Sequence, residues 1–358
     1  MRILDRYIIK KFLFTFFFIL AVIMLIAMVF DVSENIDDFL KRGAPLYEII
    51  FSHYVNFIIY YGNLFSPLLI FISVIFFTSQ MAAKTEIVAI LSSGISFRRM
   101  LFPYFIAATV LASLSFYLNN WGLPQANKER LEFESTYLKN PYKNRHKNIH
   151  KQISPGVMIY FDKYNASKDI GYKFSIEKWD GNVMTYKLLS DLVRWDTTSK
   201  TWIAENYFIR EIDGDEETIT TGKKLDSAFA FQPEEFRQRK SNVQMMNYQE
   251  LNTYIEEESL KGSSSIPFYL IEQYSRTSLP FATYILTLIG VSMASRKVRG
   301  GIGAHIALGM LVAVSYILAM KVTQVYATNA GFNPFFAVWI PNIIFGIVAI
   351  YLFRRAPK

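Results

Sequence analysis

The chain has no cysteine and only four histidines among its 358 residues. The absence of cysteine excludes disulfides, thiolate metal sites and a cysteine nucleophile. The histidines do not follow the spacing of a metal site, and lysines and arginines surround the closest pair, His146 and His150. No G-x-x-x-x-G-K-[ST] or G-x-S-x-G motif occurs. The sequence therefore predicts no catalytic constellation, no metal site, no cofactor and no ATP-binding loop of its own.

Long uncharged runs are the main feature that the chain does have. Six of them approach the roughly 20 apolar residues that a helix needs to cross a bilayer. The first run does not fit a cleavable signal peptide, because its apolar core is too long and no small-residue cleavage site follows it. The predicted spans are Phe12–Phe30, Asn56–Ser79, Met100–Tyr117, Thr277–Ser295, Ile302–Met320 and Phe335–Phe353.

Charge predicts the orientation of these spans. Basic residues dominate the N-terminus, the loops after the second and fourth spans, and the C-terminus, whereas the loop after the first span is mostly acidic. By the positive-inside rule, both termini are therefore expected to be cytoplasmic. The net charge of +8 then belongs to the membrane part and its anionic lipids, and it does not indicate nucleic acid as a partner.

The third span delivers the chain to the outer side, where residues 121–266 form an insertion. Short alternating segments rich in β-branched and aromatic residues predict strands, and Asp–Gly or Asp–Thr turns separate them. The pattern indicates an antiparallel sandwich or jellyroll-like β domain, followed by a helix at Tyr248–Glu258 and a linker at 261–267. The expected domains are 1–120, 121–266 and 267–358. The predicted strand segments are Val157–Phe161, Tyr172–Ile176, Thr185–Leu189 and Asn206–Arg210.

The polar stretch Lys84–Arg99 between the second and third spans predicts a short helix on the cytoplasmic side. Glu86 suits the first turn of a helix, and an apolar stripe follows at Ile87, Ile90 and Leu91. Gly94 can end the helix in a left-handed conformation, and Ser96 can cap the next span ahead of Arg98 and Arg99. Such a helix can receive force from a partner, and a plain amphipathic surface helix explains the stretch equally well.

Two further pairs of polar residues are candidates for function. Glu272 and Arg276 are spaced i, i+4 near the outer end of the fourth span, which favours a structural ion pair over a substrate contact. Lys41 and Arg42 are the two basic residues of an acidic outer loop. Two adjacent cations near the outer leaflet could hold a lipid phosphate, and a solvated turn before Gly43 is the alternative.

Several motifs, taken in order, resemble one family. Ile3–Ile8 is similar to the start of its G-type subunit, and the segment Glu86–Ser96 resembles its Glu-Leu-x6-Gly-hydrophobic-Ser/Thr coupling segment. Three others follow in the family's order: Trp121–Asn127, Arg276-x-x-x-Pro280 and Gly331–Asn342. Together with six spans and one outer β insertion, they indicate the lipopolysaccharide-export permease family (YjgP/YjgQ, or LptF/LptG), with more likeness to the LptG type.

The resemblance implies a transporter subunit and not an enzyme. It implies a bacterial inner-membrane permease that pairs with an LptF-type companion on a cytoplasmic, LptB-like ATPase dimer. The pair would take lipopolysaccharide from the outer leaflet and pass it to LptC/LptA-like bridge proteins in the periplasm. Carried over by position, Glu86, Ile87, Ile90, Leu91, Gly94 and Arg98 would couple to the ATPase, and Lys41 and Arg42 would face lipid A phosphates. The family's further basic residue upstream corresponds here to the neutral Asn35.

Two other classes of function remain open. A non-transporting membrane scaffold could display the periplasmic β domain for envelope assembly, and it would need neither a coupling helix nor a lipid-sized cavity. A membrane enzyme acting on lipids is disfavoured, because the sequence has no acid–base constellation. Copurification with an ATPase would separate the transporter from both.

Overall fold

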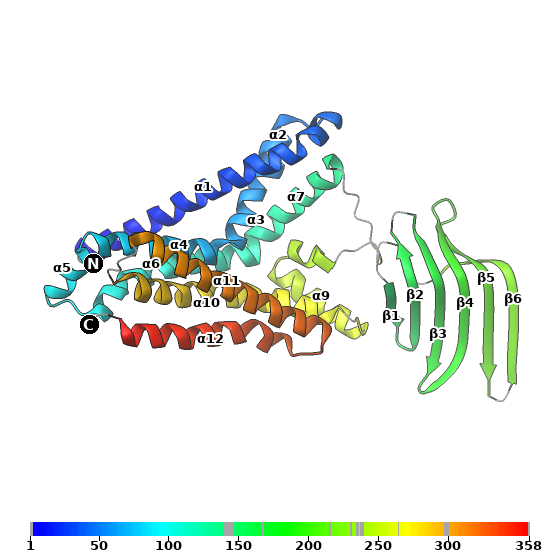
Figure 1. Cartoon of the computed structure of the whole chain (residues 1–358). Coiled ribbons are helices and arrows are strands. Elements are labelled where there is room, and N and C mark those ends of the chain that lie inside the picture. The colour runs from blue at the N-terminus through cyan, green and yellow to red at the C-terminus, as the bar shows by residue number, and fades with distance from the viewer. Residues whose placement is uncertain are drawn as a thin grey trace. The chain divides into compact units, whose positions relative to one another are not determined.

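The computed structural model describes residues 3–138, 147–166, 168–214, 216–229, 231–233, 236, 240–263, 265–296 and 301–356. The chain divides into two compact units. One comprises Met1–Lys139, Val243–Leu251 and Pro267–Lys358, and the other comprises Asn140–Asn242 and Asn252–Ile266. Each unit is described by itself below (Figure 1).

The first unit is helical, and six of its helices are long and apolar enough to cross a membrane. This confirms the six predicted spans. The corresponding helices are α1 (Ile3–Lys41), α4 (Ser66–Ala83), α6 (Phe97–Tyr117), α10 (Ile266–Ala294), α11 (Gly301–Asn329) and α12 (Pro334–Arg355).

The second predicted span is not one helix. After the short α2 (Leu46–Glu48) come a π-helical segment, η1 (Ile49–Val55), and then α3 (Asn56–Leu64). Phe65 lies in the bridge region between α3 and α4, with φ −89° and ψ −2°. Pro67 in the first turn of α4 explains the break, because proline has no N–H to continue the ladder and suits the start of a helix.

The third predicted span is longer than expected. A second π-helical segment, η2 (Leu118–Gly122), joins α6 to α7 (Leu123–Tyr137), so that one helical rod runs over 41 residues. The sequence prediction began the insertion at 121, whereas α7 belongs to the helical unit. Its buried positions Leu123, Ala126, Arg130 and Phe133 continue the helical period.

Two hydrophobic clusters hold the helices together, and α4 contributes to both. One joins α1, α4 and α6 through side chains such as Phe12, Phe77 and Tyr104, whose ring centroids lie 5.2 to 6.3 Å apart. The other joins α4 with α10, α11 and α12. Gly309 lets α11 approach α4 closely, since a Cβ at this position would lie only 2.2 Å from the side chain of Ile75 in α4. In α4, 72% of the most apolar 18-residue stretch is buried, so this helix is central to the unit. In α11 the corresponding share is 22%, so this helix presents an apolar outer face that suits contact with lipid.

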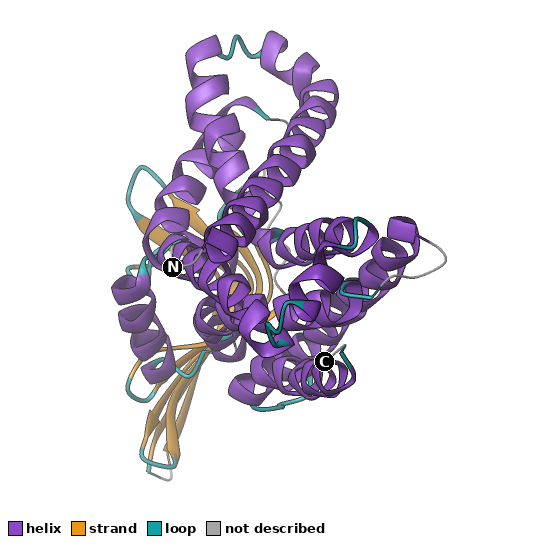
Figure 2. Cartoon of the chain, turned by 90° about the vertical axis from the view of Figure 1, so that its left-hand side faces the viewer, coloured by secondary structure: helices purple, strands orange, loops and turns teal. Residues whose placement is uncertain are grey.

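The second unit contains one antiparallel sheet in sequence order, β1-β2-β3-β4-β5-β6 (Figure 1). Figure 2 shows its strands in orange. This confirms an inserted β domain, while its jellyroll character stays a prediction. The four predicted strands fall within β2 to β5, whereas β1 and β6 were not predicted. The strands are β1 (Lys147–Ser154), β2 (Val157–Asn165), β3 (Ile170–Asp180), β4 (Val183–Asp196), β5 (Thr201–Asp213) and β6 (Glu216–Ser227).

The predicted turns join these strands. Gly181 and Gly214 adopt positive φ of 57° and 58° between β3 and β4 and between β5 and β6. Between β4 and β5, the Asp196 carboxylate accepts from the Thr198 N–H at 2.9 Å and the Ser199 hydroxyl at 3.0 Å. The backbone N–H of Thr198 and the Ser199 hydroxyl hold the pKa of Asp196 below its usual value.

A buried aromatic cluster covers one face of the sheet. Phe161, Phe174 and Trp202 from the strands pack with Phe231 and Phe236 from the segment after β6. The fully buried Trp202 donates its indole N–H to the carbonyl of Phe231 at 2.9 Å, which fixes that segment on the sheet. The predicted helix after the sheet is confirmed as α9 (Tyr248–Leu260), preceded by the 3-10 helix η3 (Lys240–Met245).

Candidate functional site

The predicted coupling stretch forms the helix α5 (Glu86–Ser92), which is shorter than the expected range 84–99. It lies at the same end of the helical unit as both chain termini (Figure 1). Gly94 has φ +84° after the helix, and Ser96 caps α6 by accepting from the backbone N–H of Arg99 at 3.3 Å. Both local predictions are confirmed. Thr85, before the helix, is also left-handed with φ 60°.

The apolar stripe of α5 faces its own helical unit. Ile87 is 1% exposed, and Ile90 and Leu91 pack partly buried against the cluster of α1, α4 and α6. Val88, which lies beside this stripe on α5, is 60% exposed. Val88 was not among the residues predicted from the sequence, although an apolar residue off the stripe was the available signal. A partner that contacts α5 from outside would meet Val88 before it met Ile87.

Glu86 and Arg99 each attach this end of the unit to α1. The Glu86 carboxylate accepts from the Tyr7 hydroxyl at 2.9 Å and lies 4.0 Å from the Lys11 ammonium. The Arg99 guanidinium donates to both oxygens of the buried Asp5 at 2.7 and 2.8 Å. The neighbouring Arg98, singled out from the sequence, is exposed.

Lys41 is the last residue of α1, and Arg42 follows it. Figure 1 shows that α1 runs from the end of the unit that holds α5 toward α2. The Lys41 ammonium lies 3.7 Å from the carboxylate of Asp37, and both side chains are largely exposed. Arg42 donates to the carbonyl of Thr136 in α7 at 2.9 Å, so its guanidinium already joins two helices. A cavity of about 220 Å³ beside Thr136 is lined by Glu48, Ser52, Glu129, Glu132, Phe133 and Tyr137 as well, an acidic lining that repels phosphate.

If these residues bind a lipid phosphate, Lys41 should contribute more than Arg42. Replacing Lys41 by glutamate is expected to lower photocrosslinking to lipid A at least threefold, because the exposed ammonium becomes a like charge. Lys321→Glu on the exposed face of α11 is the control and should change little. Equal crosslinking in Lys41→Glu, Arg42→Glu and the parent would remove both residues from the site.

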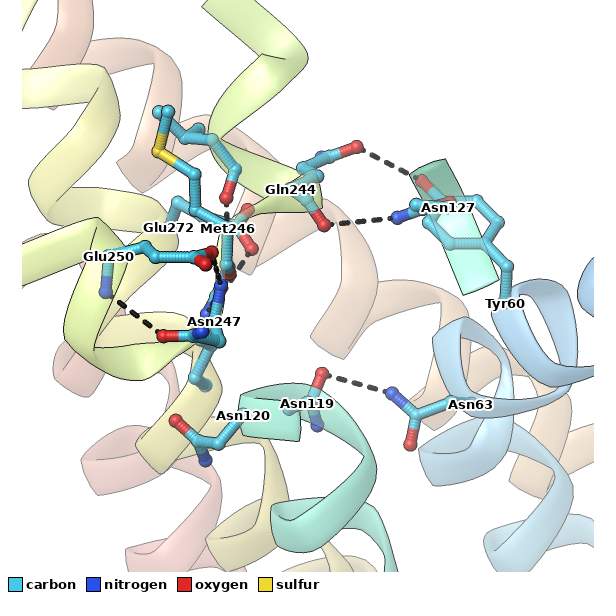
Figure 3. Close-up of polar contacts among 12 residues, drawn as sticks. Tyr60, Asn63, Asn119, Asn120, Asn127, Gln244, Met246, Asn247, Glu250 and Glu272 are labelled. Atoms are coloured by element: carbon cyan, nitrogen blue, oxygen red, sulfur yellow. Dashed lines mark hydrogen bonds and ion pairs between the residues drawn. The ribbon is translucent and has the colours of Figure 1, made fainter. Parts of the chain in front are cut away.

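Glu272 and Arg276 lie on α10 as an i, i+4 pair, with Arg276 Nε 3.4 Å from the Glu272 carboxylate. The stronger partners of Arg276 are backbone carbonyls. Its guanidinium donates to Met246 and to Val243, both at 2.9 Å, and the residue is 3% exposed. Arg276 therefore anchors the segment that leads back from the insertion (Figure 3).

Two buried polar groups near α7 were not foreseen from the sequence. Arg130 is 8% exposed and pairs with Glu134. The central carbon of its guanidinium lies 4.7 Å from the centroid of the Tyr60 ring. His53 is 1% exposed, and its Nε2 lies 3.0 Å from the carboxylate of Asp31 in α1. Both tie α7 or η1 to neighbouring helices. Among the described residues, no group of three or more histidine, aspartate and glutamate side chains could hold a metal ion.

Comparison with protein families decides the class of this molecule. The model of the family described as lipopolysaccharide export system permease LptF/LptG matches residues 6–355, nearly the whole chain. The chain belongs to this family. It is therefore an integral membrane permease of the lipopolysaccharide export system and not an enzyme in itself. The match does not separate LptF from LptG, so the likeness to the LptG type stays a prediction, and comparison with individual curated proteins gives no match.

Proposed function

We propose that this permease extracts lipopolysaccharide from the outer leaflet of the inner membrane and passes it to a periplasmic bridge of LptC/LptA-like proteins. An LptF-type companion subunit completes the membrane pathway, and an LptB-like ATPase dimer in the cytoplasm drives it. The family match over residues 6–355 carries the proposal. ATP is bound by the partner, in keeping with the absence of a P-loop motif from the sequence.

The proposed orientation rests on charge. Basic residues gather at the end that holds both termini and α5, so this end faces the cytoplasm by the positive-inside rule. The insertion between α7 and α10 then lies in the periplasm. In this orientation the exposed face of α5 is available to a cytoplasmic ATPase.

The acyl chains of the cargo make an external motor necessary. Each buried CH₂ holds a lipid in the bilayer by about 0.8 kcal/mol, so a lipid with several acyl chains cannot leave unaided. An energy source is therefore needed. Glu86, Gly94 and the exposed face of α5 would transmit its movement to the helices through the contacts with α1 and the cluster of α1, α4 and α6.

The test is copurification followed by transfer. The permease is expected to copurify with a cytoplasmic ATPase and, in proteoliposomes containing lipopolysaccharide, to release lipid to a soluble bridge protein only when ATP is hydrolysed. A matched sample with an ATPase unable to hydrolyse ATP should release at least tenfold less. Release that needs no nucleotide-hydrolysing companion would contradict the proposal, and binding of bridge proteins without any release would favour the scaffold.

A further inference from the structure

The segment Val243–Asn247, called the strap below, lies between helices of the first unit. On one side, the carbonyls of Val243 and Met246 accept from Arg276 of α10. On the other side, the carbonyl of Gln244 accepts from the side-chain amide of Asn127 in α7 at 3.3 Å. The Gln244 side chain also accepts from the hydroxyl of Tyr60 in α3 at 3.5 Å (Figure 3).

These two attachments differ in strength. The Arg276 contacts are two short bonds from a buried cation, and charge-assisted hydrogen bonds are about twice as strong as neutral ones. Breaking them would leave a guanidinium buried without those partners. The contacts of Gln244 with Asn127 and Tyr60 are neutral and lie beyond the usual 2.7–3.2 Å range, which makes them the weaker side. The strap should therefore leave α3 and α7 before it leaves α10.

The helices on the two sides pack with different neighbours. Helix α7 is tied to α1, where the rings of Phe39 and Phe133 lie 5.8 Å apart and Arg42 reaches Thr136. Helix α10 is tied to α12 by Asn342, which donates to the carbonyl of Ser278 at 3.1 Å. The strap thus bridges two helix groups, α7 with α1 on one side and α10 with α12 on the other.

The helix α9 follows the strap directly in the chain. Asn247 accepts from the N–H groups of Gln249 and Glu250, and the Glu250 carboxylate accepts from the N–H of Asn247, all at 2.9 Å. This reciprocal capping box fixes the start of the helix to the strap. The later residues of α9, from Asn252 on, belong to the unit that contains the sheet.

We propose that the strap is a mechanical link that passes movement between the two helix groups to the inserted β domain. It stays on α10, held by Arg276 as a positioning residue, and separates from Asn127 and Tyr60 when α7 and α10 part. The inference rests on the proposed function, because a transport cycle supplies the movement. Holding the strap on α7 should then stop lipid transfer without stopping ATP hydrolysis by the partner.

The cysteine-free sequence makes a crosslinking test direct. Asn127→Cys and Gln244→Cys are introduced into the full chain and joined by a short, reductant-cleavable thiol reagent in the complex with the ATPase. ATP-driven lipopolysaccharide transfer is expected to fall at least tenfold while ATP hydrolysis stays within twofold, and reductant should restore transfer. The matched control joins Glu177→Cys to Lys187→Cys, which are cross-strand partners in β3 and β4, and should transfer normally.

A second measurement tests the attachment of the strap to Arg276 and does not depend on lipid transport. Arg276→Lys keeps the charge and loses the two-pronged guanidinium, so hydrogen exchange of residues 243–251 should rise at least fivefold, whereas Glu272→Gln should leave it nearly unchanged. Full transfer by the crosslinked complex, or equal exchange in Arg276→Lys and the parent, would overturn the inference. If the uncrosslinked parent itself transfers no lipid with an active ATPase, the proposed function fails instead, and the exchange result still decides how the strap is attached.

Discussion

Arginine in place of Val88 is expected to weaken binding of the cytoplasmic ATPase at least tenfold and to lower ATP-driven lipid transfer with it. Val88 is the 60% exposed apolar residue on the outer face of α5. A charge buried in an interface without a counter-ion carries a desolvation penalty of several kcal/mol, and about 1.4 kcal/mol corresponds to a factor of ten in affinity. The charge would be buried against the partner without a counter-ion. Folding should be unaffected, because the substituted side chain starts in solvent.

The matched control for this experiment is Val183→Arg. Val183 begins β4 and is 63% exposed, so the chemical change and the starting exposure are nearly the same. Affinity for the ATPase can be measured by titrating labelled permease in nanodiscs. Val88→Arg should lose binding while Val183→Arg keeps it. Equal binding by both variants would show that the ATPase does not use the outer face of α5.

The membrane part of the fold could be predicted from the sequence because the bilayer leaves few options. Backbone groups in hydrocarbon must be satisfied within a helix, so each uncharged run of suitable length became helical, with one break at Phe65 in the second run. Alternation and Asp–Gly turns likewise located β2 to β5. Strand β6 was missed because Glu216–Ser227 is almost entirely exposed and carries charges and threonines in place of an apolar face.

The irregular helices could not be predicted in the same way. The segments η1 and η2 lie just outside the predicted runs Asn56–Ser79 and Met100–Tyr117, and no charged residue interrupts the former run at the break at Phe65. π-Helical segments shift the hydrogen-bond register by one residue without a characteristic composition. The side-chain amide of Asn119 in η2 accepts from that of Asn63 in α3 at 3.0 Å, and such tertiary pairing supports the irregular backbone (Figure 3).

The position of the candidate coupling helix could be predicted from the sequence, but which of its faces points to solvent could not. The stripe Ile87, Ile90 and Leu91 correctly indicated an amphipathic helix, but a stripe looks the same whether it faces its own core or a partner. Hydrogen-bond partners that lie far away in the sequence could not be predicted either. Glu86 bonds to Tyr7, 79 positions earlier, and Arg276 bonds to carbonyls 30 and 33 positions away. Residue spacing in one helix predicted the weaker pair of Arg276 with Glu272, because only that pair is local.

The largest stability loss is expected for Arg99→Met. Asp5 is 2% exposed, and Arg99 donates to both of its oxygens. Removing the guanidinium leaves a buried carboxylate that has lost two charge-assisted bonds, which costs about 3 kcal/mol. Asp5→Asn should cost less, about 1 kcal/mol, because the Arg99 side chain is 34% exposed and can turn to water. The cap of α6 is retained in Arg99→Met, because Ser96 accepts from the backbone N–H of residue 99.

Arg98→Met is the matched control, since it removes the same charge from the neighbouring position and alters the positive-inside signal equally. Arg98 is exposed, and substitutions of exposed residues usually stay within about 0.5 kcal/mol. Free energies of unfolding measured in mixed micelles should therefore differ by more than 2 kcal/mol between the two variants. If they agree, the Asp5–Arg99 pair does not hold α1 to α6. Movement of α5 would then reach α1 through Glu86 and the hydrophobic cluster instead, because those are the remaining contacts described between this end of the unit and α1.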